Sequence, residues 1–333
     1  MSSNQQNGAV LGREFTQNVI DAMGPKTSPR LRQVMGALIS HIHDFAREVQ
    51  LTTDEWMAGV ELINEAGRMS NDRRNEGQLL CDVIGLESLV DDITFTTAIH
   101  SANGLTASAI LGPFWRHDTP HRDNGTTITF DTPPDGQVVY MHGKVTDVTT
   151  GKPLQNASVD VWQASTNGLY EQQDDDQKEH NLRGVFHTDA EGCYSFYCLR
   201  PTPYPVPMDG PAGKLLGMMD RQVFRPAHIH LMVCNHVHSL LAPVPVPVPV
   251  PVPMPMPIPF GTRRILSSNA KEQVQQEGYK SLTTQIFDHK CKYLDKDSVF
   301  AVKDELKVEF VPRKGDPQAP LELEYNITLA KTS

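Results

Sequence analysis

The stretch "GVFHTDAEGCYSFYCL" (residues 184–199) indicates what kind of fold most of this chain adopts. It contains two short runs rich in β-branched and aromatic residues, divided by a Gly-containing turn. Similar runs occur before and after it, at a spacing of about ten residues and without helical patterns between them. These runs are "VVYMHGKVTD" (138–147), "ASVDVWQAS" (157–165), "HIHLMV" (228–233), "LKVEFVPRK" (306–314) and "LELEYNITLA" (321–330). Their spacing predicts an antiparallel β-sandwich.

The first third of the chain has a different pattern. Apolar residues recur there at the spacing of amphipathic helices. Ser28 followed by Pro29 indicates an N-cap and a first helical residue, and Thr53 or Asp54 is the expected cap of a second helix. The three predicted helices cover residues 28–50, 52–70 and 75–98. We therefore expect an N-terminal helical region over residues 1–108 and a mainly β domain, an antiparallel sandwich, over residues 109–333.

Composition excludes several classes of protein. The 333 residues carry a net charge of −10, so there is no basic surplus to replace the counterions of a nucleic acid. There is no apolar run of about 18 residues for a membrane helix, and the N-terminus lacks the layout of a signal peptide. The five cysteines are irregularly spaced, which fits neither a disulfide framework nor a CxxC zinc site. We expect a cytoplasmic protein without nucleic-acid or membrane partners.

Three His-x-His pairs are candidates for a metal site: His41/His43, His228/His230 and His236/His238. The first lies in a helical pattern, where residues two apart point in different directions and cannot bind one ion. The second lies in a strand-like run, where residues two apart share a face and can chelate. The third borders a Pro-Val repeat and has no defined periodicity. Two imidazoles alone leave zinc, copper, nickel and iron open.

Two tyrosines in turn-like settings, Tyr170 in "ASTNGLY" and Tyr204 in "RPTPYPVPMDGP", extend the candidate site. A lone Tyr after a turn is ordinarily a packing residue, because a phenol has a pKa near 10 and stays neutral. Only a hard, highly charged ion would hold two phenolates. If both tyrosines are ligands, they indicate ferric iron.

The segments "NGLY", "TPYPVPMDGP" and "RPAHIH" resemble the iron-binding segments of the intradiol ring-cleaving dioxygenases, the catechol and hydroxyquinol 1,2-dioxygenases. The resemblance extends over most of the chain, including the helical first third and the segments "ILGPFW", "NLRGVFHTDAEGCYSF" and "GYKSLTTQIFD". The segments "YPVP", "GPAGKLL" and "YLDKDSVFAVKD" resemble the hydroxyquinol branch more than the catechol branch.

The resemblance implies a set of residue roles around one non-haem Fe(III) per chain. Its ligands would be Tyr170, Tyr204, His228 and His230. Tyr204 would act first as a ligand and then as the base that accepts a proton from the diol. Arg225 would stabilise charge that develops on the substrate. Gln285 matches a polar residue near the iron in the catechol branch, whereas hydroxyquinol enzymes often have His there.

The same resemblance gives the expected pocket and function. Apolar walls suit a flat aromatic substrate, and the expected lining is Leu89, Asp92, Ile110, Leu111, Gly112, Pro113, Phe114, Val206 and Pro207. We expect cleavage of hydroxyquinol (benzene-1,2,4-triol) by O2, with catechol as the alternative substrate, and a homodimer formed through the N-terminal helices. An iron-free transthyretin-like binding module is the alternative from another class. A zinc hydrolase is disfavoured, because such a site usually pairs His with carboxylate or Cys.

A Pro-Val-rich insert at about residues 234–276 interrupts the β domain. Alternating Pro prevents ladder hydrogen bonding and favours polyproline II, so we expect an exposed segment. As a surface loop it would cost on the order of 1–2 kcal/mol, and it could bind a partner domain. We hypothesise instead a translated retained intron, because joining "HIHLMV" to "QEGYKSLTTQIF" restores the family spacing. Possible splice signals lie at Val233–Cys234, Ser268–Asn269 and Gln275 or Gln276.

Overall fold

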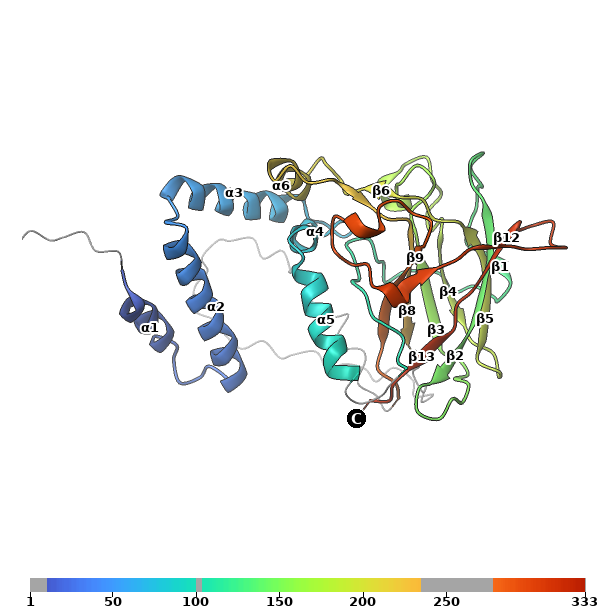
Figure 1. Ribbon diagram of the computed structural model, residues 1–333, viewed down its shortest axis with the longest axis horizontal. Helices are drawn as coiled ribbons and strands as arrows, with labels where there is room; N and C mark the ends of the chain where they lie inside the picture. The colour runs from blue at the N-terminus through green and yellow to red at the C-terminus, as the bar shows by residue number, and fades with distance from the viewer. Residues whose placement is uncertain (1–10, 100–103, 235–277, 333) are drawn as a thin grey trace, which may run out of the picture. The chain divides into compact units, whose positions relative to one another are not determined.

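The computed structural model describes residues 11–99, 104–234 and 278–332 (Figure 1). Apart from Cys234, the Pro-Val insert lies outside these residues, as does the His236/His238 pair. The chain divides into two compact units, Met1–Glu65 and Ala66–Ser333, with the division inside a helix. The boundary predicted at residue 108 was placed differently, where the sequence changes from helical to strand patterns. No helix in the described part of the chain is long and apolar enough to cross a membrane.

The first unit consists of helices: α1 (Arg13–Asp21), α2 (Pro29–Glu48) and most of α3 (Thr53–Met69). The predicted cap of α2 is confirmed, because Ser28 Oγ accepts a hydrogen bond from the backbone N–H of Leu31 at 3.3 Å. The predicted cap of α3 is wrong. Thr52 and Glu55 form a reciprocal capping box in which each side chain accepts from the other's backbone N–H, so the cap lies one residue earlier.

The third predicted helix is two helices, α4 (Glu76–Val83) and α5 (Leu86–Ile99). Gly85 has a φ of +76°, a left-handed conformation that ends α4 and redirects the chain. The expectation of one continuous helix is therefore wrong. Both α4 and α5 belong to the second unit, where α4 contacts α6 (Pro211–Met218).

The second unit is built on two packed β-sheets (Figure 1). The first has the order β1 (Thr126–Thr127), β5 (Cys193–Leu199), β2 (Val138–Asp147), β12 (Leu321–Glu324) and β11 (Val311–Pro312), and β13 (Ile327–Leu329) also pairs with β2. The second has the order β10 (Lys307–Val308), β9 (Leu282–Asp288), β8 (His228–Cys234), β3 (Ser158–Trp162) and β4 (Arg183–His187). A separate ribbon joins β6 (Tyr204–Pro205) to β7 (Phe224–Arg225).

Alternation along the strands explains this layering. Every second residue of β2 is buried, and those side chains meet the apolar residues of the opposite sheet, such as Val159 and Ile229, in one core. The predicted helical region followed by a β-sandwich is confirmed. The central pairs are antiparallel as expected, but β1, β10, β12 and β13 join their neighbours in parallel, so both sheets are mixed.

Candidate metal centre

The two histidines of "RPAHIH" lie on β8, which has β3 on one side and β9 on the other. Their Nε2 atoms are 3.2 Å apart, as the period of a strand predicts. His228 Nδ1 is 2.6 Å from the carbonyl oxygen of Pro226, which leaves Nε2 available for a ligand. The ring of His230 stacks on Trp162, with centroids 4.7 Å apart. Both imidazoles are therefore buried and held by their neighbours.

Two tyrosines from separate segments complete the cluster. Tyr170 precedes the short η1 helix (Glu171–Gln173), and Tyr204 lies on β6. Their hydroxyl oxygens are 3.0 Å apart, and that of Tyr204 is 3.3 Å from Nε2 of His228. Gly168 makes this approach possible. It has a φ of +82°, and a Cβ at this position would lie only 2.7 Å from Cβ of Tyr204.

The four donor atoms fit a single metal ion. They form a chain with neighbouring separations of 3.0, 3.3 and 3.2 Å. Ligand atoms about 2 Å from one ion lie roughly 3 Å from each other. Burial lowers the pKa of both His228 and His230, so the imidazoles are neutral, as ligands must be. Burial also raises the pKa of Tyr170 and Tyr204, so two phenolates here require a strongly charged cation.

Arg225 lies beside this cluster and is 4% exposed. Its Nη1 is 3.0 Å from His228 Nε2, and its Nη2 donates to Gln285 Oε1 at 2.7 Å. Its Nε donates to Asp297 at 3.3 Å. Gln285 in turn donates to the carbonyl oxygen of Ile110 at 2.8 Å. Burial disfavours the charge, but Asp297 and the phenols keep the pKa of Arg225 above its ordinary value. The structure thus holds a charged guanidinium next to the donor atoms.

Several predicted wall residues lie close to the cluster. Phe114 stacks on Tyr170 with centroids 4.7 Å apart, and Leu111 packs against the same aromatic group. A Cβ at Gly112 would lie 3.2 Å from Cε1 of His230, so the backbone there passes against the imidazole. Ile110 and Val206 share a neighbouring apolar cluster. Pro113 and Pro207 are half-buried, and Pro207 also lines a hollow of about 640 Å³ beside Tyr204.

The two wall residues predicted on the third helix have exposed positions on α5. Leu89 is 57% exposed, and Asp92 is also exposed. Asp82 on α4 is instead 1% exposed, and one of its carboxyl oxygens lacks a hydrogen-bond partner among the described residues. Burial raises the pKa of Asp82 well above its usual value; Glu87 adds to the rise, and the charge of Arg225 opposes it. The charge of Arg225 beside the candidate metal centre therefore acts on the carboxyl of Asp82.

Sequence reasoning did not find Asp82 or Asp297. Asp297 accepts hydrogen bonds from Arg225 and from the backbone N–H groups of Val299 and Ala301. It lies in "YLDKDSVFAVKD", and the only signal for its role is its place in that segment. The other predicted pair, His41 and His43, lies on α2, where His43 hydrogen-bonds Thr16 at 3.0 Å and stacks on Phe15. This contact gives His43 a packing role.

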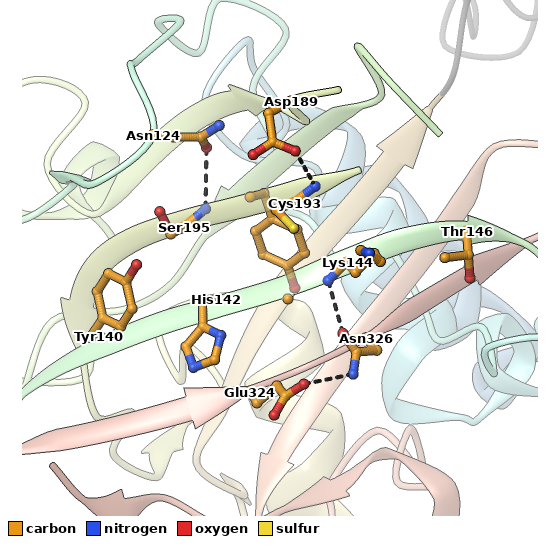
Figure 2. A pocket seen from close by; sticks show the side chains of 12 residues that line it. Asn124, Tyr140, His142, Lys144, Thr146, Asp189, Cys193, Ser195, Glu324 and Asn326 are labelled. Carbon is orange, nitrogen blue, oxygen red and sulfur yellow. Dashed lines mark hydrogen bonds between the residues drawn. The ribbon is translucent and has the colours of Figure 1, made fainter. Parts of the chain in front are cut away.

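A second hollow lies on the opposite sheet, over β2, β5 and β12 (Figure 2). It has a volume of about 740 Å³ and is lined by polar side chains, including His142, Lys144 and Glu324. Figure 2 shows that Asn326 connects Glu324 to the backbone of Lys144 through hydrogen bonds. The four predicted ligands are not part of this lining, so the hollow is separate from the candidate metal centre.

Comparison with known proteins identifies the family. A model described as "Catechol dioxygenase N terminus" matches residues 28–99, and one described as "Dioxygenase" matches residues 110–243. An intradiol ring-cleavage dioxygenase of Aspergillus niger, prcA, is 46% identical over 95% of this chain and 87% of its own length. The chain belongs to the intradiol ring-cleavage dioxygenase family. It is therefore an enzyme that cleaves the ring of a catechol-type diol, and an iron-free binding module is not supported.

Other members of the family differ in the substrate named for them. Catechol 1,2-dioxygenase of Candida albicans is 42% identical over 97% of this chain and 94% of its own length. Hydroxyquinol 1,2-dioxygenase of a Rhizobium species is 32% identical over 98% and 94%. The solved hydroxyquinol 1,2-dioxygenase of Pseudomonas putida DLL-E4 has a TM-score of 0.72 and 30% identity over 96% of this chain and 98% of its own. The catechol 1,2-dioxygenase of Pseudomonas arvilla C-1 has a TM-score of 0.72 and 26% identity over 96% and 92%.

These relatives change the expectation about the branch. The two with 46% and 42% identity are prcA and a catechol 1,2-dioxygenase, whereas the hydroxyquinol 1,2-dioxygenases reported above have 32% and 30%. The family assignment from "RPAHIH" and the two tyrosine segments is confirmed. The preference for the hydroxyquinol branch is not supported at the same level.

Proposed function

We propose that this dioxygenase cleaves catechol at a non-haem ferric centre held by Tyr170, Tyr204, His228 and His230. The observation that carries the proposal is the chain of four donor atoms, two phenols and two imidazoles, separated by 3.0, 3.3 and 3.2 Å. The family uses non-haem Fe(III), and two phenolates match a hard trivalent ion. A bound ferric ion would withdraw electron density from the diol and make its ring reactive toward O2.

The chain's own residues would orient the diol and accept one of its two protons. The oxygen of Tyr204, as a phenolate, is the candidate acceptor of that proton, since it lies between Tyr170 and His228 in the cluster. Arg225 would stabilise negative charge on the bound diol, and Gln285 and Asp297 hold its guanidinium in place. The apolar side chains of Ile110, Phe114 and Val206, with those of Leu111 and the prolines beside them, would exclude water from the ring.

A visible absorption band tests the ligand assignment. Tyrosinate bound to Fe(III) absorbs visible light by charge transfer, so protein with one iron per chain should be coloured. Tyr170→Phe and Tyr204→Phe should each weaken or shift the band. Tyr194→Phe is a matched control, because Tyr194 is an equally buried phenol in the sandwich core. Colourless protein that contains one iron per chain would contradict the proposal.

Hydroxyquinol is the second candidate substrate, and Asp82 favours it. A buried carboxyl with an unpartnered oxygen near Arg225 could bind the third hydroxyl of the triol, which catechol lacks. The departure of Gln285 from the histidine common in hydroxyquinol enzymes argues for catechol. We would compare kcat/KM for the two substrates in the wild type and in Asp82→Asn. A tenfold or larger loss for the triol alone would support hydroxyquinol, whereas equal losses would remove this argument.

We also propose that the chain forms a homodimer through α2. A row of large apolar side chains along this helix and at its C-cap is 42–53% exposed: Leu31, Val34, Leu38, Ile42, Phe45 and, at the cap, Val49. They recur every three or four residues, the spacing of a helix face that packs on another helix. Leu38→Glu with Ile42→Glu should convert a dimer to monomers in light scattering, whereas Glu61→Gln should not. A wild-type monomer at micromolar concentration would refute this proposal.

The cytoplasmic location expected from the sequence stays a prediction.

A further inference from the structure

A buried ion pair lies behind Tyr170. Arg183 on β4 is 0% exposed, and its Nε donates to Glu171 Oε2 at 2.6 Å. Its Nη2 donates to the side chain of Gln172. Glu171 directly follows Tyr170 in the chain and is itself 7% exposed. The two residues that follow Tyr170, Glu171 and Gln172, therefore both hydrogen-bond to the buried guanidinium of Arg183.

The guanidinium also faces the aromatic ring. Its carbon lies 5.8 Å from the centroid of Tyr170, within the range of about 6 Å in which a cation acts on an aromatic ring. Nη1 of Arg183 is buried and has no hydrogen-bond partner among the described residues. Arg183 and Tyr170 are 0% and 1% exposed, so solvent does not screen the charge from the ring. The positive charge acts on Tyr170 through a medium with little water.

Glu171 balances part of this charge. It accepts from Arg116 Nη1 at 2.8 Å as well as from Arg183, so two guanidinium groups share one buried carboxylate. The further carboxylates that Arg116 binds, Asp118 and Glu179, are 45% and 67% exposed and therefore screened by water. Arg116, Arg183 and Glu171 together keep a net positive charge beside Tyr170. The charge of Arg183 also acts on the buried carboxyl of Asp160, whose pKa burial raises to about 7.

We propose that Arg183 is a positioning residue whose buried positive charge stabilises Tyr170 as a phenolate ligand and sets the energy of its charge-transfer band. The inference rests on the proposed ligation of iron by Tyr170. A nearby cation lowers the energy of the electrons on a phenolate. More light energy is then required to move an electron from that phenolate toward a metal. The charge beside Tyr170 therefore moves the band to shorter wavelength, and it favours the deprotonated form of Tyr170 that can bind the metal.

The two partners of the ion pair give predictions of opposite sign. Arg183→Met removes the cation, so the band should move to longer wavelength, and iron affinity should fall about 10–100-fold, as for other groups that support metal ligands. Glu171→Gln removes the balancing anion, so the band should move to shorter wavelength. A general disturbance of the site would move both bands the same way. The direction of the two shifts separates the electrostatic role from a structural one.

Two further variants serve as controls. Arg183→Lys keeps the charge and should restore most of the wild-type band position. Arg200→Met removes an arginine that pairs with Asp288 and lies at the same 5.8 Å from a ring centroid, but that ring is Phe310 in the sandwich core. It should leave the band unchanged. Iron affinity would be measured by competition with a chelator, alongside the absorption spectra.

The outcomes distinguish this inference from the proposed function. Shifts of the same sign in Arg183→Met and Glu171→Gln, or no shift in a folded Arg183→Met, would overturn the role of Arg183. If Arg183→Met does not fold, the direction of the Glu171→Gln shift decides the inference alone. A wild-type protein that binds iron without a visible band would instead contradict the ligation by Tyr170 on which the inference rests.

Discussion

Asp160 should make the stability of the sandwich depend on pH. It lies on β3, is 7% exposed, and accepts a hydrogen bond from Nε1 of Trp115 at 2.9 Å. Its other carboxyl oxygen is buried without a partner among the described residues. Burial raises the pKa of Asp160 from its ordinary 3.8 to about 7, against the effects of Trp115 and of the charge on Arg183. This carboxyl anchors Trp115, the residue after the pocket wall Phe114.

The direction of the effect follows from proton binding. Between pH 4 and 7 the unfolded chain has lost the proton of Asp160, whereas the folded protein retains it. The unfolded state then binds fewer protons, so the free energy of unfolding falls as pH rises through this window and levels off above about pH 7. A difference of about three pH units at about 1.4 kcal/mol each gives a total loss of about 4 kcal/mol. About 2–3 kcal/mol of this loss lies between pH 5 and pH 8.

Denaturant unfolding of the wild type and Asp160→Asn at pH 5 and pH 8 measures this loss. Asn keeps the size of the side chain and can still accept from Trp115, but it does not titrate. From pH 5 to pH 8, the free energy of unfolding should therefore fall by about 2–3 kcal/mol more in the wild type than in Asp160→Asn. Other titrating groups contribute equally to both proteins and cancel in the comparison. The reasoning would be refuted if the free energies of unfolding of the wild type and the variant differed by the same amount at pH 5 and at pH 8.

Three other predictions concern the metal centre. Asp297→Asn leaves the buried charge of Arg225 without its partner, so denaturant unfolding should show a loss of about 3 kcal/mol; an unchanged midpoint would contradict the pairing. Gly168→Ala adds a Cβ 2.7 Å from Cβ of Tyr204, so iron content should fall well below that of Gly125→Ala, which has a similar φ of +79° but open space around it. Removal of iron with a chelator should lower the melting temperature, because a ligand bound only to the folded state stabilises it; identical scans would count against a bound ion.

The sequence predicted those parts of the site that depend on local periodicity. His228 and His230 meet because residues two apart on a strand share a face, and this rule needs no tertiary information. The approach of Tyr170 to Tyr204 depends on two segments 34 residues apart in the chain, so only the family resemblance indicated it. The partnership of Arg225 with Asp297, 72 residues away, had no local signal.

The helices show the limits of a pattern more clearly. The apolar periodicity across residues 75–98 continues through Gly85, so it predicted one helix where the structure has α4 and α5. That break changes which residues are buried. Asp82 on α4 is inside, whereas Leu89 and Asp92 on α5 are exposed. A single helical phase across both segments could not have identified Asp82, because its burial depends on how α4 packs against α6.

The position of β8 inside its sheet has a consequence for how the site opens. Both edges of this strand are hydrogen-bonded, to β3 and to β9, so its backbone amides should be among the slowest to exchange with solvent. Tyr170 and Tyr204 lie on a turn and on a two-residue strand, so we expect smaller fluctuations to release them. Partial opening would therefore separate the phenols from the imidazoles while His228 and His230 stay together. The candidate metal centre should therefore unfold in two stages. The two phenols separate first, and the two imidazoles separate only when β8 unfolds.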